Sequence, residues 1–284
     1  MEKMVPLPGI YYPDFIAANQ EDRADHVLPG MDKQKHLEKI RQDIRKFKKD
    51  NGVDKVVIMW SANTERFSEI VPGVNDTIDN LMSSIKRGIK NVSSSTIYAV
   101  ASILEGSSFI NGSPQNTLVP GVIDLARSKG VWIVGDDFKT GQTKFKTAFV
   151  DYLIGAGLKP ESIVSYNHLG NNDGMNLSSK AQFESKKKSK SNCVSTMISG
   201  NKILYPTKES EKIDHDIVIR YIPSAGDSKK AIDEYITDIF MGGKNVVSVY
   251  NVCEDSLLAA PIIMDLIILT ELMQRIEWKT LGMK

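Results

Sequence analysis

The sequence predicts an α/β protein with a partial Rossmann-like, doubly wound domain followed by an α+β domain. Over the first half of the 284 residues, amphipathic helices alternate with short apolar runs rich in β-branched residues, which is typical of parallel strands joined by crossover helices. In the second half, strand candidates follow one another with fewer helices between them, which favours a mixed sheet. A chain of this length is expected to form two domains, each able to bury a core.

Each helix and strand predicted in the first half rests on a local sequence pattern. Leu37, Ile40, Ile44 and Phe47 form an apolar stripe that Gly52 ends, which predicts a helix. The run VDKVVIMW after it predicts a buried parallel strand. The next expected elements are a helix with the stripe Ile78, Leu81, Met82, Ile85 and Ile89, a helix to Leu104 capped by Ser94 or Ser95, a strand at 108–110, a helix at 118–129 and a strand in VWIVGDDF.

The second half is expected to be richer in strands. The strand candidates are 163–166, 203–205, 217–222 and 246–250. GDSKKA is predicted to begin a helix whose apolar face is Ala231, Tyr235, Ile236 and Ile239, and 180–190 is predicted to be helical or mobile. The longest apolar run, from Ser256, contains Pro261, Asp265 and Glu271, so it predicts a buried helix rather than a membrane span.

Composition excludes several classes of function. The chain has 36 Lys and Arg against 35 Asp and Glu, so no net field favours nucleic acid or an anionic membrane, and an anionic ligand needs a local cluster of cations. Cys193 and Cys253 lack the spacing of a disulfide framework or a metal site, which favours a reduced, cytoplasmic setting without a metal. The N-terminus has no apolar region typical of a signal peptide.

Three polar segments follow successive predicted strands: WSANTERF, NGSPQNT and GDDFKTGQTK. The carboxyl ends of parallel strands are where ligands collect in open α/β sheets, so the recurrence favours a phosphate or sugar site. Each segment taken alone is equally compatible with ordinary turns and helix caps. No G-x-G-x-x-G follows an early strand, so the residues by themselves give no complete dinucleotide fingerprint.

Lysines and a polar loop form a second group of candidates. Lys186 and Lys190 in ESKKKSKS share a helical face, although the pattern alone favours a solvated basic face over a binding site. Lys229, placed at the start of a helix, opposes the helix dipole unless an anion is bound. SYNHLGNNDGMNLSS is typical of a turn in which Gly170 and Gly174 allow unusual backbone angles. Asp255 is predicted to lie at a strand-to-helix junction, where helix capping explains its presence.

Seven segments in order along the chain carry a family resemblance. They are FIAANQ (15–20), SANTERF (61–67), NGSPQNT (111–117), GDDFKTGQTK (135–144), SYNHLGNNDGMNLS (165–178), GDSK (226–229) and NVCEDSLLAAP (251–261). Together they strongly resemble the eukaryotic myo-inositol-1-phosphate synthases, also called inositol-3-phosphate synthases, from about Met4 to Trp278. The resemblance implies conversion of glucose 6-phosphate to inositol phosphate through oxidation at C5, enolisation, aldol closure and reduction, with NAD regenerated in each turnover.

The resemblance also assigns roles to residues. Lys186, Lys190, Lys229 and Asp137 are the implied catalytic residues, acting in phosphate binding, oxyanion stabilisation and proton transfer. The implied substrate-binding residues are Thr140, Asn171, Asn172 and Asp173, and His168 is expected to orient their loop. The implied NAD-binding residues are Asn63, Thr64, Asp137, Asp227, Asp255 and Ser256.

The chain departs from the family in two ways. ESKKKSK stands at 184–190 where the family usually has RSKEISK, which alters the local charge but keeps both lysines. The Gly-rich loop for the NAD pyrophosphate and a C-terminal active-site lysine are missing, so the chain is expected to be the central part of a longer protein.

The expected domains are a partial NAD-binding domain (1–143), a catalytic and tetramerisation domain (144–254) and a helix returning to the first domain (255–284). The family implies a homotetramer. The alternative is an inactive, truncated paralogue that assembles with full-length subunits.

Overall fold

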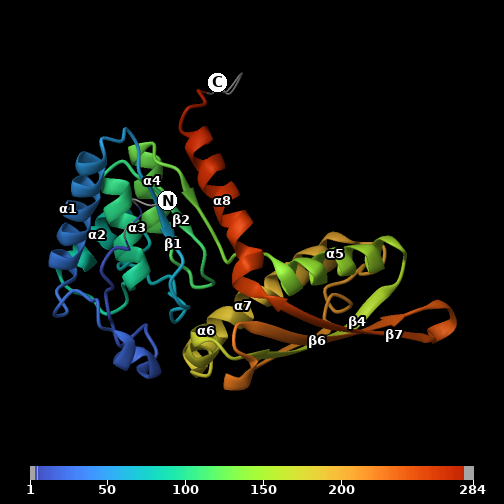
Figure 1. Cartoon of the computed structure of the whole chain (residues 1–284). Coiled ribbons are helices and arrows are strands. Elements are labelled where there is room, and N and C mark those ends of the chain that lie inside the picture. Colours follow the sequence, from blue (N-terminus) through green and yellow to red (C-terminus); the bar gives the residue numbers. More distant parts are fainter. Residues whose placement is uncertain (1–3, 5, 278–284) are drawn as a thin grey trace, which may run out of the picture. The chain divides into compact units, whose positions relative to one another are not determined.

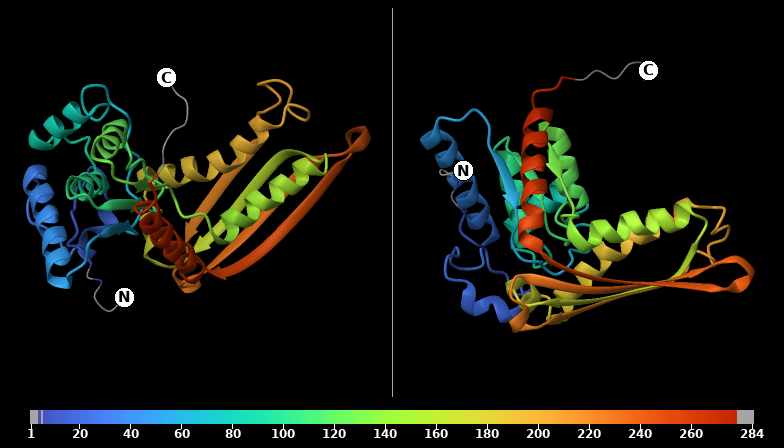
Figure 2. Two further views of the ribbon diagram at one scale, coloured as in Figure 1. Left: turned by 90° about the horizontal axis from the view of Figure 1, so that it is seen from above. Right: turned by 45° about the vertical axis from the view of Figure 1, so that its right-hand side comes forward.

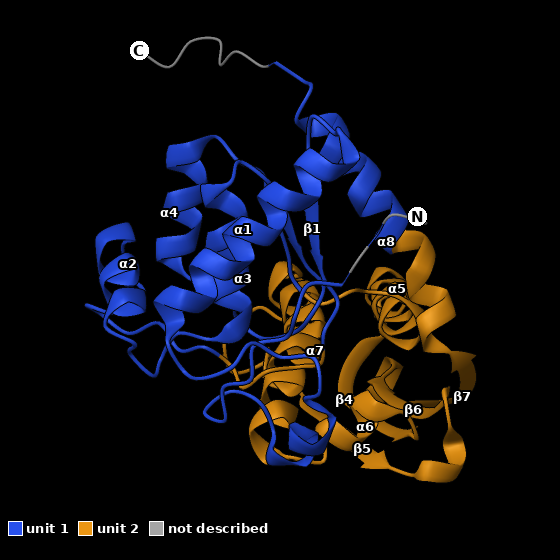
Figure 3. Cartoon of the chain, turned by 60° about the vertical axis from the view of Figure 1, so that its left-hand side comes forward, with its two compact units in different colours: residues 1–62, 68–136, 263–284 blue, residues 63–67, 137–262 orange. Residues whose placement is uncertain are grey.

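The computed structural model describes Met4 and residues 6–277 and divides the chain into two compact units (Figure 3). Unit 1 comprises 1–62, 68–136 and 263–284, and unit 2 comprises 63–67 and 137–262. The predicted α/β fold class is confirmed. The boundaries of the predicted NAD-binding and catalytic domains, at residues 143 and 254, stay a prediction.

Unit 1 is built on a three-stranded parallel sheet in the order β1-β2-β3, as the helix–strand alternation predicts (Figure 1). Its strands are β1 (Val57–Trp60), β2 (Ser108–Asn111) and β3 (Ile133–Val134), and its helices are η1 (Ala18–Arg23), α1 (Lys33–Asn51), α2 (Ile78–Lys86), α3 (Ser94–Leu104) and α4 (Pro120–Lys129). The stripes of α1 and α2 and nearly all of α3 are buried in one apolar core. The polar segments predicted to follow successive strands do so, because β1, β2 and β3 end at residues 60, 111 and 134.

Helix ends in unit 1 follow local chemistry with two corrections. Gly52 ends α1 in the left-handed conformation at φ 58°, as predicted. The N-cap of α3 is Ser93 rather than Ser94 or Ser95, because the Ser93 hydroxyl accepts the Thr96 N–H at 3.2 Å. Helix α2 ends at Lys86, so Ile89, the last member of its predicted stripe, lies beyond the helix.

Unit 2 pairs a four-stranded mixed sheet with helices on one face (Figures 1 and 2). The strand order is β5-β4-β6-β7, with β4 parallel to β5 and antiparallel to β6, which is antiparallel to β7. The strands are β4 (Lys159–Leu169), β5 (Asp214–Tyr221), β6 (Ser228–Asp238) and β7 (Lys244–Glu254); the helices are α5 (Gly141–Gly155), α6 (Asn172–Asn176), α7 (Lys180–Gly200), η2 (Pro223–Ala225) and η3 (Phe240–Gly242). Helices α5 and α7 pack on the sheet over a small apolar core that includes Val150, Ile163 and Val194.

Two predictions in unit 2 are wrong. The segment from Lys229 is strand β6 rather than a helix, because every second residue from Lys229 to Thr237 is buried and both edges of the strand are paired. Residues 203–205 form a turn rather than a strand, since the Asn201 side chain accepts the backbone N–H groups of Ile203 and Leu204. Long-range pairing and local capping each override a short apolar pattern.

The apolar run near the end of the described chain forms helix α8 (Asp255–Met273), with Pro261 inside it. The prediction that this helix is buried is wrong for the described residues, of which only Thr270 is buried. By length and composition α8 is apolar enough to cross a membrane, a property that core helices of water-soluble proteins share. Residues 278–284 of the predicted closing segment lie outside the described residues.

Candidate functional site

Unit 2 buries three lysines between its helices and its sheet. Lys146 comes from α5, Lys190 from α7 and Lys229 from β6, and they are 5%, 6% and 7% exposed. A buried ammonium group is costly unless an opposite charge or hydrogen-bond acceptors compensate it. The surroundings of each lysine therefore indicate what it is for.

Lys186 has a counter-ion. Its Nζ lies 2.9 Å from both carboxylate oxygens of Asp137, and the Ser189 hydroxyl donates to Asp137 Oδ2 at 3.3 Å. Burial opposes the charge of Lys186, but Asp137 and Asp173 outweigh that effect and raise the pKa of its ammonium group. Lys186 is therefore a fixed cation held by a carboxylate.

Lys190 is the unpaired member of the group. Among the residues that the structure describes, no hydrogen bond or ion pair to its ammonium group is found, although the side chain is 94% buried. Burial lowers the pKa of Lys190 well below its ordinary value, and the charges of Lys229, Lys186 and Lys146 lower it further. A bound anion would supply the missing negative charge.

Lys229 lies on a strand, so the reasoning that placed it at a helix N-terminus is wrong. The alternation of β6 turns its side chain into the interior, where Nζ lies 3.5 Å from Asp255 Oδ2. Asp255 is the first residue of α8, where the helix dipole favours a carboxylate. The strand-to-helix junction predicted for Asp255 is confirmed.

The NNDG loop forms the short helix α6. Asn171 caps it by accepting the Gly174 N–H at 3.0 Å, while Asp173 lies near the charged groups of both α7 and β6. Burial raises the pKa of the Asp173 carboxyl, Asp137 raises it further, and Lys186 opposes this. The structure thus brings Asp137, Asp173, Lys186 and Lys190 into one cluster.

Gly170 and Gly174 serve close packing, and the prediction of unusual backbone angles is wrong because neither has a positive φ. A Cβ on Gly170 would lie 2.2 Å from Gly226 N, and one on Gly174 would lie 2.6 Å from Leu169 Cβ. A side chain at either position would displace the loop.

Thr140 occupies the N-cap position of the 15-residue helix α5, yet its hydroxyl makes no capping hydrogen bond. The next residue, Gly141, has φ +50°, and a Cβ there would lie 3.3 Å from Asp255 Oδ1. The start of α5 therefore faces the same carboxylate that Lys229 approaches. Close contact with Asp255 and Cys253 favours glycine at this position.

The remaining predicted residues lie in unit 2 with different surroundings. Thr64 is buried, and its carbonyl accepts the Asn176 side-chain amide at 2.9 Å, which ties 63–67 to α6. Asn63 and Asn172 are half-buried, and Asp227 and Ser256 are exposed beside Lys229 and Asp255 in the sequence.

Sequence reasoning missed the buried polar residues Gln142, Lys146, Ser165 and Asp233, which lie close to the cluster. Period-two alternation across 229–237 could have placed Asp233 on the inner face with Lys229. The i, i+4 spacing of Gln142 and Lys146 could have placed these two on one face of α5.

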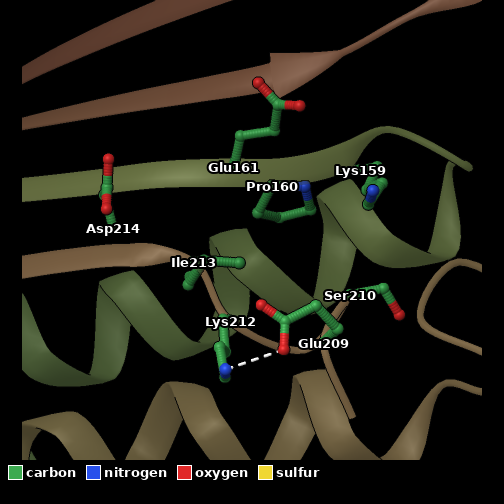
Figure 4. A pocket seen from close by; sticks show the side chains of 8 residues that line it. All are labelled: Lys159, Pro160, Glu161, Glu209, Ser210, Lys212, Ile213 and Asp214. Carbon is green, nitrogen blue, oxygen red and sulfur yellow. Dashed lines mark hydrogen bonds and ion pairs between the residues drawn. The ribbon is translucent and has the colours of Figure 1, made fainter. Parts of the chain in front are cut away.

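A surface groove of about 390 Å³ lies at the amino-terminal end of β4 (Figure 4). It is lined by Lys159, Pro160, Glu161, Glu209, Ser210, Lys212, Ile213 and Asp214. Its charges are partly paired, as in the Lys212–Glu209 ion pair at 2.7 Å. Because an 11-residue strand spans roughly 35 Å, this groove is remote from the lysine cluster near the carboxyl end of β4.

Comparison with known proteins identifies the family. The family model described as myo-inositol-1-phosphate synthase, an NAD-binding family, matches residues 1–284. The chain is 62% identical over 279 residues to inositol-3-phosphate synthase of Dictyostelium discoideum and 61% identical over 280 residues to inositol-3-phosphate synthase 1-B of Xenopus laevis. These matches cover 98% and 99% of the chain but 54% and 49% of the relatives, so the chain spans about half their length.

Solved structures agree. The crystal structure of inositol-3-phosphate synthase from Caenorhabditis elegans matches with a TM-score of 0.94 and 58% identity, covering 99% of this chain and 54% of that one. A myo-inositol-1-phosphate synthase-related protein from Thermotoga maritima shares the fold at 19% identity and a TM-score of 0.74, over 93% of this chain and 65% of its own. The chain belongs to the myo-inositol-1-phosphate synthase family.

Proposed function

We propose that the chain carries the substrate-binding and proton-transfer part of an inositol-3-phosphate synthase. The reaction is the NAD-dependent isomerisation of D-glucose 6-phosphate to 1D-myo-inositol 3-phosphate, the first step of inositol biosynthesis and a supply for phospholipid biosynthesis. The observation that carries the proposal is Lys190, a residue 94% buried whose ammonium group has no ion-pair partner among the described residues. Family membership supports the identity of the anion as a sugar phosphate.

The substrate phosphate binds between Lys190, Lys229 and the start of α5. Backbone N–H groups in the first turn of a helix and the helix dipole favour a phosphate group. The Thr140 hydroxyl is not used to cap α5, so it can donate to a phosphate oxygen. Two lysines and a helix N-terminus together offset the dianion, although the net charge of the chain as a whole is only +1.

Lys186 and Asp137 act on the reacting carbons. Enolisation and aldol closure both develop negative charge on oxygen, and a cation already fixed in place stabilises that charge better than water does. Asp137 holds the Lys186 ammonium through both carboxylate oxygens, so Lys186 is preorganised. Asp173, whose carboxyl pKa burial raises, can hold a proton and donate a hydrogen bond to a substrate hydroxyl, with Asn171 and Asn172 beside it.

NAD fits the residues around Asp255. Oxidation and re-reduction of a sugar require a hydride acceptor close to the substrate, and Asp255 lies 3.5 Å from Lys229 and beside the start of α5. The carboxylates of Asp255, Asp227 and Asp137 and the polar groups of Ser256, Asn63 and Thr64 would hold the cofactor. When bound, NAD supplies the oxidation at C5 and the final reduction.

The proposed assembly is a homotetramer in the cytoplasm. The sheet face of unit 2 away from α5 and α7 carries an exposed row of Tyr166, Ile232 and Tyr250 on three neighbouring strands. A contiguous exposed apolar patch of this kind is typical of a protein interface. Tyr250→Asp is expected to reduce the oligomer, measured by light scattering, while Lys244→Gln on the same strand is not.

A chimera tests the proposal directly. The segment of the Dictyostelium discoideum synthase that matches this chain is replaced by this chain, and inositol phosphate formation from glucose 6-phosphate is measured. Activity within about tenfold of the parent enzyme is expected, and Lys229→Ala in the chimera is expected to abolish it while circular dichroism stays unchanged. Near-normal activity of that variant would refute the role of Lys229.

The inactive-paralogue reading predicts a different result. A chimera that folds, binds inorganic phosphate and joins parent subunits without any turnover would favour it. Retention of Lys186, Lys190, Lys229 and Asp137 in one cluster favours the active enzyme, because an inactive subunit has no need of an unpaired buried charge.

A further inference from the structure

The inner face of the unit 2 sheet is polar beneath the lysine cluster and apolar further along. Strand register sets Ser165 of β4 opposite Asp233 of β6, and both are almost fully buried. Two residues along the strands, Ile163 faces Tyr235 in the apolar core. The boundary between polar and apolar interior therefore falls at Asp233, where Gln142 of α5 contacts the sheet.

Asp233 is 2% exposed and is held by two donors. Gln142 Nε2 donates to Oδ1 at 2.8 Å, and the Tyr235 hydroxyl donates to Oδ2 at 3.2 Å. Since an ionised carboxylate only accepts hydrogen bonds, the Gln142 amide must turn its nitrogen toward Asp233. The opposite end of that amide, Oε1, is then buried without a partner among the described residues.

Lys146 supplies the charge next to this carboxylate. One turn after Gln142 on α5, its Nζ donates to the Ser165 hydroxyl. Burial lowers the pKa of Lys146, and Asp233 is the largest opposing influence. The sheet thus holds the first two turns of α5 through one charge-assisted hydrogen bond to Gln142 and one hydrogen bond from Lys146.

We propose that Asp233 is a positioning residue, which fixes the first turn of α5 through Gln142 so that Thr140 and the helix N-terminus meet the substrate phosphate. The inference rests on the proposed function only for the identity of the ligand. The contact itself joins the sheet to the turn that begins at Thr140, and a charge-assisted hydrogen bond is about twice as strong as a neutral one. An apolar pair at the same place would pack α5 equally well but would not fix its rotation.

The test compares Asp233→Asn with Tyr235→Phe. The first keeps the shape but removes the charge that orients Gln142, while the second removes the other donor and leaves the Gln142 contact intact. In the chimera, Asp233→Asn is expected to raise KM for glucose 6-phosphate about tenfold with kcat changed less than about threefold, and Tyr235→Phe to change both less than about twofold. An unchanged KM in Asp233→Asn would overturn the proposal.

Hydrogen exchange keeps the test independent of turnover. In the chain itself, the amides of 144–147 are expected to exchange about fivefold faster in Asp233→Asn and unchanged in Tyr235→Phe. If the chimera is inactive while this difference is found, the proposed function fails and the positioning role stands. Equal exchange in both variants would refute the positioning role whatever the activity.

A double variant separates positioning from charge balance. Asp233→Asn combined with Lys146→Met removes both buried charges and is expected to recover the melting temperature lost in Asp233→Asn but not its KM. Recovery of KM together with the melting temperature would show that Asp233 serves only to neutralise Lys146.

Discussion

Two lysines, one in each unit, are buried to nearly the same degree but have opposite surroundings. Lys33 in unit 1 is 4% exposed, donates to the Val92 carbonyl at 2.5 Å and lies 3.7 Å above the Tyr12 ring. Lys190 in unit 2 is 6% exposed and has no such partner among the described residues. Burial alone therefore does not distinguish the two lysines, whereas the presence or absence of a compensating partner does.

The same contrast extends to the cores around them. Unit 1 buries apolar helices and strands in one large cluster, while unit 2 has a smaller apolar cluster and places charged residues at the end of the sheet next to α6. Uncompensated charge reduces the stability of a folded chain, which is the basis of the proposal that an anion compensates it in unit 2.

The largest effect is expected for Lys190→Met. In the chimera this change should lower kcat/KM at least about a hundredfold, because a fixed cation is lost. The same change should stabilise the chain by roughly 1–4 kcal/mol, since an unpaired buried charge is removed. Urea unfolding measures the expected gain in stability, and inositol phosphate formation measures the expected loss of kcat/KM. A loss of stability would contradict the account of Lys190.

The second-largest effect on kcat/KM is expected for Asp137→Asn. Losing the carboxylate that holds Lys186 is expected to lower kcat/KM about a hundredfold or somewhat less, mainly through kcat. Asp124→Asn, which breaks the exposed Arg127–Asp124 pair of unit 1, is the matched control and should leave kinetics unchanged. Equal effects of the two changes would remove the special role of the Lys186–Asp137 pair.

Lys33→Met should invert the result for Lys190. The Val92 carbonyl loses its buried donor, so the chain should be destabilised by roughly 1–3 kcal/mol while turnover of the chimera stays within about twofold. Thermal unfolding and steady-state kinetics provide the measurement. A more stable Lys33→Met variant would mean that the two lysines do not differ as described.

Phosphate binding should be linked to protons through Lys190. The pKa of the Lys190 ammonium group is depressed in the free chain and rises when a bound anion supplies the opposite charge. Binding therefore takes up protons, and the affinity for phosphate falls as the pH rises between the pKa of the free chain and that of the complex. Calorimetry with inorganic phosphate in buffers of different ionisation heat measures the uptake, which Lys190→Met should abolish.

The pH dependence that Lys190 gives to folding stability has the opposite sign to that of a lysine in an ion pair. A lysine pKa depressed below its ordinary 10.5 destabilises the folded chain at low pH, and this cost shrinks as pH rises from the depressed value toward 10.5. The stability gap between Lys190→Met and the original chain should therefore narrow with rising pH. A gap that widens would contradict the depressed pKa.

The smallest effect is expected in the charged groove at the far end of unit 2. Lys212→Gln removes the exposed Lys212–Glu209 ion pair, which is worth about 0–1 kcal/mol. Activity of the chimera should stay within about twofold. A loss comparable to that of Asp137→Asn would move the functional site to this groove.

Local signals predicted much of the fold. The stripe of α1 with its Gly52 stop, the short apolar strands of unit 1 and the Asp255 junction all follow from periodicity and cap chemistry. The same reasoning misread 229–239 as a helix, because Ala231, Tyr235, Ile236 and Ile239 also fit a helical period. Pairing with β4 and β7 decides for the strand, and no short window of sequence contains that information.

By itself, the sequence determined the fold class, the position of the polar segments after the strands of unit 1, and the family, through segments such as GDDFKTGQTK and GDSK. Only the tertiary structure decided that Lys186 is paired and Lys190 is not, and that Asp233 lies under α5. The reason is physical: local patterns follow from backbone geometry over a few residues, whereas the energy of a buried charge depends on groups that are distant in the chain and adjacent in space.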